Sequence, residues 1–311
     1  MTKNSLFTIR FLASFLLITI VIQILLGAWV RLTGSGMSCP DWPLCYGFFF
    51  PSLEKINQLG VIEYSYFQIF LEWIHRANAA FIIGPLSIIL FIYLVLLKNI
   101  KKKIKLHAYY LIILLGIQGL LGGLTVMKSN IPWSVAIHLA SAFLLFYVVL
   151  RILLLSFDKV KNNIFIGHKT KKLIYLSLLL ALITACAGAF TSKYGASLSC
   201  SKWPLCNQSL LPNFRDQFEV IHFTHRMLAF TLVLFLLFTL FRLSKYFNLF
   251  SIQIKVAYLI IPLIIIIQIS IGALLIYFDI PIWMGIFHQF MGLLLFACIS
   301  VLLFYINQKI Q

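Results

Sequence analysis

Charged side chains, and acidic ones above all, are scarce in this sequence. Only 8 of its 311 residues are Asp or Glu, and all charged residues together make up 11%. Hydrophobic residues make up 62%, and the mean hydropathy is +1.00. An ordinary soluble domain is about 45–50% apolar and about 25% charged. The composition therefore excludes a soluble globular protein and indicates one that lies in a membrane.

Long apolar runs fill the chain and leave no room for a separate soluble domain. Each run is about 20 residues long, the length a helix needs to cross the hydrocarbon core. A helix also satisfies its backbone hydrogen bonds within one segment. We expect eight transmembrane helices at about residues 11–30, 70–97, 107–127, 135–155, 173–191, 220–241, 256–277 and 285–306. No small-residue cleavage site ends the first run, so we expect a retained span.

The basic residues act as topology signals. A net charge of +17 could suggest nucleic acid as a partner, but the lysines and arginines lie in short loops between apolar runs. Most of them fall at the two termini and in the alternate loops 98–105, 151–172 and 242–255. The positive-inside rule then places both termini in the cytoplasm. We expect a protein of the bacterial inner (cell) membrane, with lipid around it and no nucleic acid bound.

An internal repeat relates the two halves of the chain. One set of residues recurs 150 positions later: His75, Arg76, Gln118, Gly122, Trp133 and His138 return as His225, Arg226, Gln268, Gly272, Trp283 and His288. The Cys-x-x-Trp-Pro-Leu-Cys segment of the first outer loop recurs 161 positions later. The first outer loop is therefore longer than its counterpart. Gly122 and Gly272 are expected to permit close helix approach or to leave room for a flat macrocycle.

Each half holds four of the expected spans. Because four is an even number, both halves enter the membrane from the same side, and we expect an axis along the membrane normal to relate them. We therefore predict an all-α polytopic membrane protein built as two pseudo-symmetric four-helix bundles, residues 1–156 and 157–311.

Four histidines lie near the outer ends of spans: His75 and His138 in the first half, and His225 and His288 in the second. An imidazole within a membrane is costly and tends to mark function. Two imidazoles that face each other at one depth are what axial ligation of a haem iron requires. A single such histidine is more often a hydrogen-bonded core residue. Four at repeat-related positions favour a haem site in each half.

Two arginines and one acid accompany these histidines. Arg76 and Arg226 each follow a histidine directly, where a guanidinium can pair with a haem propionate or extend to the outer interface. Glu72 lies three residues before His75, on the same helix face, and its repeat partner is His222. This asymmetry makes Glu72 a candidate catalytic residue. The alternatives are a structural partner of Arg76 or a protonated acid bonded within the bundle.

The outer loops hold two pairs of cysteines, Cys39 with Cys45 and Cys200 with Cys206. An oxidising exterior favours a disulfide in each pair. A metal clip, which would need more ligands nearby, and a surface redox thiol pair are the alternatives.

The stretches GAWVRLTGSGMSCPDWPLC and EWIHR, the region around His138, and their counterparts in the second half together resemble the haem A synthase family. Members of this family are membrane enzymes that convert haem O into haem A for terminal oxidases. The resemblance covers all eight spans. It implies an oxidoreductase that oxidises a ring methyl of haem O to a formyl group.

The resemblance also implies the role of each site residue. The first half would bind the substrate haem O through His75 and His138, and the second would keep haem b as cofactor on His225 and His288. Glu72 would be needed for the reaction, and Cys39 and Cys45 would form a functionally relevant pair. Haem O synthase and a quinol or another electron donor are the partners this activity suggests.

A hypothesis for the reaction follows from these roles. Electrons pass from the haem b half to the haem O half, where the ring methyl is oxidised twice and the hydrated product loses water to leave a formyl group. Glu72 would manage protons or stabilise charge beside that methyl. An iron with two histidine ligands has no open position for oxygen, so either one ligand leaves or oxidation occurs elsewhere.

Two other functions would use the same histidines. One is a two-haem membrane cytochrome that only passes electrons, against which Glu72 stands because it breaks the repeat symmetry. The other is a haem transporter or chaperone that works by alternating access between the halves. Few broken helices are expected from the sequence, which weakens the second alternative.

Overall fold

The computed structural model describes residues 2–60, 63–157 and 166–307. Over these ranges the chain is helical, and no strand forms beyond isolated β-bridges. Eight helical spans in the described residues are long and apolar enough to cross a membrane. They are α1 (Lys3–Leu32), the joined segments α3 (Tyr66–Ala77), η1 (Asn78–Ile83) and α4 (Gly84–Leu96), α5 (Lys102–Met127), α6 (Pro132–Ser156), α7 (His168–Lys193), α8 (Gln217–Ser244), α9 (Ile252–Tyr277) and α10 (Ile282–Ile306). The eight predicted spans of a multi-pass, all-α protein are thus confirmed.

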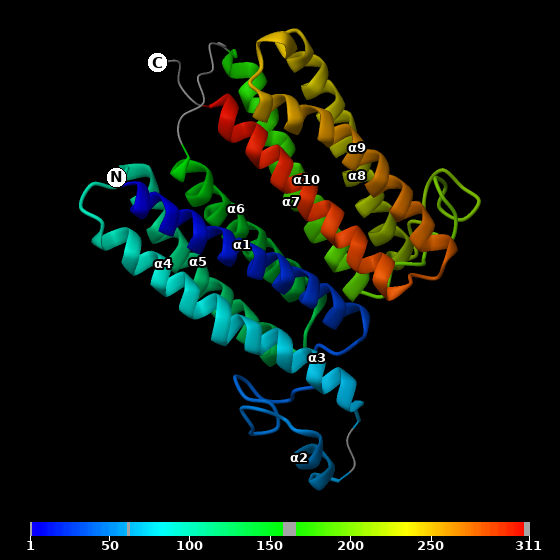
Figure 1. Cartoon of the computed structure of the whole chain (residues 1–311). Coiled ribbons are helices and arrows are strands. Elements are labelled where there is room, and N and C mark those ends of the chain that lie inside the picture. Colours follow the sequence, from blue (N-terminus) through cyan, green and yellow to red (C-terminus); the bar gives the residue numbers. More distant parts are fainter. Residues whose placement is uncertain (1, 61–62, 158–165, 308–311) are drawn as a thin grey trace. The chain divides into compact units, whose positions relative to one another are not determined.

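The first compact unit, Met1–Phe157, contains four of these spans. In it α6 packs on α1 and α5, α5 packs on α4, and α1 contacts both α3 and α4, so the four spans close into a bundle (Figure 1). The short helix α2 (Leu53–Gln58) lies in the loop between α1 and α3, beyond the start of α3 (Figure 1). Packing of apolar side chains between the helices gives this unit its own core.

The second compact unit, Asp158–Gln311, has the corresponding neighbours. Here α10 packs on α7 and α9, just as α6 packs on α1 and α5, and α7 packs on α8. A short 3-10 helix, η2 (Phe247–Leu249), precedes α9. Each unit is therefore a bundle with the same order of packed helices, whereas the axis relating the two units stays a prediction.

The second span of the first unit is interrupted by a π-helical turn. The turn η1 follows α3 directly, and the N–H of Gly84 donates to the carbonyl of Ala79, five residues back. The buried Asn78 amide donates to Oε1 of Gln23 at 2.7 Å, and Nε2 of Gln23 donates to the backbone carbonyl of His75 at 2.9 Å. Turns of this kind are frequent at functional sites. Here the π-helical turn begins three residues after a candidate haem ligand.

The equivalent helix of the second unit, α8, runs without interruption from Gln217 to Ser244. Thr184 and Leu228 stand where the first unit has Gln23 and Asn78. Leu228 has no side-chain amide to donate, so the polar contact cannot be repeated. The two units therefore differ in backbone geometry beside the histidine of their second span.

Candidate functional site

A disulfide-closed loop covers one end of the first bundle. Cys39 and Cys45 form a disulfide, and both are buried. The carboxylate of Asp41 accepts hydrogen bonds from the backbone N–H groups of Tyr46 at 2.6 Å and Gly47 at 2.8 Å. These two residues have φ values of 54° and 75°, so the side chain of Asp41 holds a left-handed turn. Partial burial and then nearby negative groups raise the pKa of the Tyr46 phenol.

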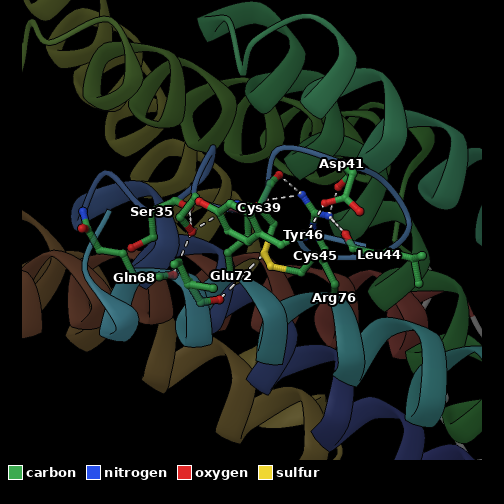
Figure 2. Close-up of polar contacts among 11 residues, drawn as sticks. Ser35, Cys39, Asp41, Leu44, Cys45, Tyr46, Gln68, Glu72 and Arg76 are labelled. Atoms are coloured by element: carbon green, nitrogen blue, oxygen red, sulfur yellow. Dashed lines mark hydrogen bonds and ion pairs between the residues drawn. A yellow bond between two sulfur atoms is a disulfide. The ribbon is translucent and has the colours of Figure 1, made fainter. Parts of the chain in front are cut away.

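Glu72 of α3 lies beneath this loop and is only 3% exposed (Figure 2). Its Oε2 accepts hydrogen bonds from the Ser38 hydroxyl at 3.0 Å and from the Cys39 backbone N–H at 2.9 Å. Its Oε1 accepts one from Nη2 of Arg76 at 2.6 Å. The Ser38 hydroxyl has a single proton and also faces the carbonyls of Ser35 at 2.8 Å and Gln68 at 2.9 Å, so the two N–H donors are the constant partners of the carboxylate. A buried carboxylate is tolerated when it is paired in this way. The contact with Arg76 is the structural alternative expected for Glu72, so its catalytic role stays a prediction.

Arg76 fastens the loop to α3. Its guanidinium donates to the carbonyls of Cys39 at 2.9 Å and Leu44 at 2.6 Å, and also to the carbonyl of Asp41 (Figure 2). The planar fork of arginine presents several donors in fixed directions, which matches this set of acceptors. These partners are the loop and Glu72, so the predicted propionate contact of Arg76 stays a prediction.

The second unit repeats the arginine anchor. Cys200 and Cys206 form a disulfide, and Arg226 of α8 donates to the carbonyls of Cys200 at 2.8 Å, Lys202 at 2.8 Å and Leu205 at 2.9 Å. These carbonyls occupy the positions equivalent to those bound in the first unit. The arginine that follows each histidine therefore has the same anchoring contact in both units, and a propionate contact of Arg226 likewise stays a prediction.

The acid beneath the loop has no equivalent in the second unit. The backbone N–H of Cys200 donates at 3.3 Å to Nδ1 of His222, which is 6% exposed and takes the place of Glu72. Besides Arg226, Asn207 also ties the second loop to α8, because its Nδ2 donates to Glu219 at 2.8 Å. A neutral ring thus replaces a carboxylate at the same backbone contact, and this sets the two sites apart chemically.

The four candidate ligands lie on different helices: His75 on α3, His138 on α6, His225 on α8 and His288 on α10. Each ring faces a glycine of an adjacent helix. A Cβ added to that glycine would lie 3.2 Å from His75 at Gly27, 3.4 Å from His138 at Gly122, 2.9 Å from His225 at Gly188 and 3.2 Å from His288 at Gly272. Such distances are at or below ordinary contact, so each glycine makes room for an imidazole.

The disulfide loop also contacts the helix that faces His138. A Cβ on Gly123 of α5 would lie 3.4 Å from the ring of Trp42, and the neighbouring Gly122 faces His138. The loop is therefore anchored to α3 through Arg76 and lies against α5 through Trp42. Two of the helices beside the first candidate haem site, α3 and α5, are therefore in contact with the loop.

The hydrogen bonding of the histidine rings is compatible with ligation of a haem iron. Nδ1 of His138 and of His225 is buried and has no hydrogen-bond partner among the described residues. His75 and His138 lie within electrostatic range of each other. A neutral imidazole with an unused nitrogen is the form that binds a metal. The four loop cysteines are joined in two disulfides, which leaves no thiolate for a metal clip.

Sequence reasoning did not find three of the contacts at this site. It missed the Ser38 hydroxyl bond to Glu72, the arginine bonds to loop carbonyls, and the contact between Gln23 and Asn78. The internal repeat could have indicated the contact between Gln23 and Asn78, because the equivalent residues of the second half are different in type. The first two depend on how the loop folds back, which no spacing in the sequence reveals.

Comparisons with known proteins give the family. The model of the family described as Cytochrome oxidase assembly protein matches residues 10–300. A Bacillus pumilus protein named Heme A synthase is 26% identical over 97% of this chain and 98% of its own length. A protein of the same name from Flavobacterium psychrophilum is 26% identical over 89% of this chain and 92% of its own length. Another, from Exiguobacterium sibiricum, is 29% identical over 75% of this chain and 75% of its own length. The chain belongs to the cytochrome oxidase assembly protein family.

Proposed function

We propose that this protein is a haem A synthase, a membrane oxidoreductase that oxidises a ring methyl of haem O to a formyl group. The observation that carries the proposal is Glu72, a buried carboxylate one helical turn before His75 and fixed in place by two N–H donors. The family and the names of its relatives support the same activity. The arrangement unites a carboxylate and candidate haem ligands in one bundle.

The first unit is proposed as the substrate half. His75 and His138 would hold haem O there, and Gly27 and Gly122 make room for their rings. The carboxylate stands only in this unit, because His222 replaces it in the second. A carboxylate three residues before the histidine of the second span, where it could accept a proton released from an oxidised methyl, is therefore present in the first unit only.

The second unit is proposed as the cofactor half. His225 and His288 would hold haem b, which when bound would supply one-electron oxidation and reduction. Gly188 and Gly272 leave space for the two rings. The residues fit this group, because Nδ1 of His225 is buried without a hydrogen-bond partner in the described part of the chain.

Glu72 has two tasks that follow from its contacts. Its bond to Arg76 fixes the carboxylate relative to the loop, which keeps it in one place on α3. The Ser38 hydroxyl on Oε2 can rotate, so this oxygen is the one that can exchange a donor for an incoming proton. Glu72 would then stabilise positive charge or take up a proton beside the substrate.

The setting of the enzyme completes the proposal. With both termini in the cytoplasm, the disulfide loops lie at the outer surface, where oxidation of the cysteines is favoured. Haem O would arrive from a haem O synthase, and a quinol or another donor would exchange electrons with the haem b half.

A pigment assay tests this function. The full chain is produced in cells that make haem O and have no haem A synthase of their own, and the haems are extracted and separated. We expect haem A with the natural chain and only haem O and haem b with Glu72→Ala. Glu54→Ala in the exposed helix α2 is the control and should still yield haem A. Bound haem without any haem A from the natural chain would instead identify an electron carrier.

A further inference from the structure

Two amide side chains meet where α1 packs on the second span of the first unit. Nδ2 of Asn78 donates to Oε1 of Gln23 at 2.7 Å and to the carbonyl of Thr19 at 3.4 Å. Nε2 of Gln23 donates to the carbonyl of His75 at 2.9 Å. Backbone carbonyls only accept hydrogen bonds, so the two carbonyls at the ends of this chain of contacts fix which atom of each amide is nitrogen and which is oxygen.

These contacts leave the amide pair with one free acceptor and one free donor. Oδ1 of Asn78 accepts no hydrogen bond from the described residues. This oxygen is still accessible, although Asn78 as a whole is only 9% exposed. Gln23 uses one of its two amide N–H groups, and the other has no acceptor in the described part of the chain. A hydroxyl group both donates and accepts, so one hydroxyl can satisfy both atoms.

The amide pair lies beside the candidate haem ligand of this span. Asn78 follows His75 by three residues, and Gln23 precedes Gly27, which makes room for the His75 ring, by four. Each amide is therefore one helical turn away from that contact and on the same helix face. Because α1 runs toward the disulfide loop and α3 runs away from it, the pair lies on the side away from the loop. Glu72 lies one turn from His75 on the side of the loop.

The second unit has no such pair. Thr184 and Leu228 take the two places, and Leu228 offers no polar atom. The hydroxyl of Thr184 is buried and has no hydrogen-bond partner among the described residues. The helix α8 also continues without the π-helical turn that begins at Asn78. A polar pair that only one unit contains suits a property in which the haems of the two units differ.

We propose that Gln23 and Asn78 form a specificity site that binds a hydroxyl group of the substrate haem. This inference rests on the proposed function, which gives haem O to the first unit and haem b to the second. Haem O carries a hydroxyalkyl chain where haem b carries a vinyl group, so a hydroxyl distinguishes the two. The Asn78 oxygen accepts the proton of that hydroxyl, and the free N–H of Gln23 donates to its oxygen. A haem without the hydroxyl would cover both amide atoms and leave them unpaired, which disfavours haem b in this unit.

Two synthetic haems isolate the hydroxyl from the rest of the substrate. Mesohaem has ethyl groups in place of both vinyl groups, and haematohaem has hydroxyethyl groups in the same places. Neither has the long chain, so they differ in their hydroxyl groups alone. The full-length protein with haem b in its second unit is titrated with each ferric haem without reductant. Absorbance spectra then give the two dissociation constants of the first unit, and their ratio, mesohaem over haematohaem, measures recognition of the hydroxyl.

Replacing Asn78 should lower this ratio. Asn78→Leu, which introduces the residue of the second unit, removes the acceptor, so the ratio should fall by about 2–10-fold, the contribution of one hydrogen bond. Ser87→Ala is the matched control and should leave the ratio unchanged. Ser87 is a buried polar residue of the same span whose hydroxyl has no hydrogen-bond partner in the described ranges. Asn78→Ala adds no bulk and gives the same reading if the leucine variant does not fold.

The outcomes separate this inference from the proposed function. A lower ratio in the Asn78 variant, with the control unchanged, supports the specificity site. An unchanged ratio, including one that results from equal loss of affinity for both haems, overturns it, since a pair that only braces the π-helical turn would affect both haems alike. Binding of both haems that persists undiminished in His75→Ala would instead refute the first unit as a haem site, and with it the proposed function.

Discussion

The backbone N–H of Cys39 donates to the carboxylate of Glu72 at 2.9 Å, which joins the first disulfide loop to the helix that carries His75. The loop is thereby part of the site rather than a cover above it. In the second unit the same backbone donor meets His222, a neutral ring. The backbone N–H of the first loop cysteine thus meets a carboxylate in one unit and an imidazole in the other. This difference distinguishes the candidate reaction site from the candidate supporting site.

Replacing the arginine anchors should destabilise the two units unequally. Arg76→Ala leaves the buried Glu72 without its cation, and loss of one partner of such a pair costs about 3–5 kcal/mol. Arg226→Ala removes bonds to carbonyls alone, so a smaller loss is expected. Thermal unfolding in detergent and proteolysis of the outer loops measure both effects. Arg76→Lys should not restore stability, because one ammonium cannot reproduce the planar fork. Equal melting temperatures for Arg76→Ala and the natural chain would contradict the anchoring role.

A methyl group on Gly188 should displace the ring of His225. The added Cβ would lie 2.9 Å from Cε1, closer than real contacts allow, so either the ring or α7 must shift. We expect Gly188→Ala to lower haem affinity in the second unit by about 10–100-fold, as changes beside metal ligands commonly do. Gly119→Ala is the matched control, because no described atom lies within 4 Å of a Cβ there. Full haem occupancy in Gly188→Ala, measured by haem content per chain, would be inconsistent with ligation by His225.

The π-helical turn should depend on Asn78. Asn78→Leu removes the donor to Gln23 and leaves that amide oxygen partly buried without its bond, at a cost of about 1–3 kcal/mol. Because Gln23 also binds the carbonyl of His75, the spectrum of the haem in the first unit should change while that of the second does not. Asn57→Ala in the exposed helix α2 serves as control. An unchanged spectrum together with an unchanged melting temperature would show that the turn forms without this contact.

The spans and the outer-loop cysteines were predictable for clear physical reasons. A run of about 20 apolar residues has one stable form in lipid, so the positions of the eight helices follow from hydropathy alone. The spacing of Cys39 and Cys45 and their predicted place in an outer loop favoured a disulfide, and the structure contains it. These features depend on local composition or short separations.

The contacts that define the site depend on longer separations. Arg76 and the carbonyl of Leu44 are 32 positions apart and meet only because the loop folds back over α3. No periodicity predicts which carbonyls a guanidinium will reach. The π-helical turn could not be predicted either. In the sequence Asn78 is a single polar residue in an apolar run, and nothing there shows that it contacts Gln23. Ligation by the four histidines and the roles of the two halves stay predictions.

The most direct test of the central claim is the haem composition of cells that make haem O and carry either Glu72→Gln or His222→Gln. In Glu72→Gln the side chain keeps its size but cannot take up a proton as a carboxylate does. In His222→Gln the side chain keeps an acceptor for the Cys200 N–H. We predict that Glu72→Gln still binds haem and yields no haem A, whereas His222→Gln still yields haem A. As much haem A from Glu72→Gln as from the natural chain would contradict the account.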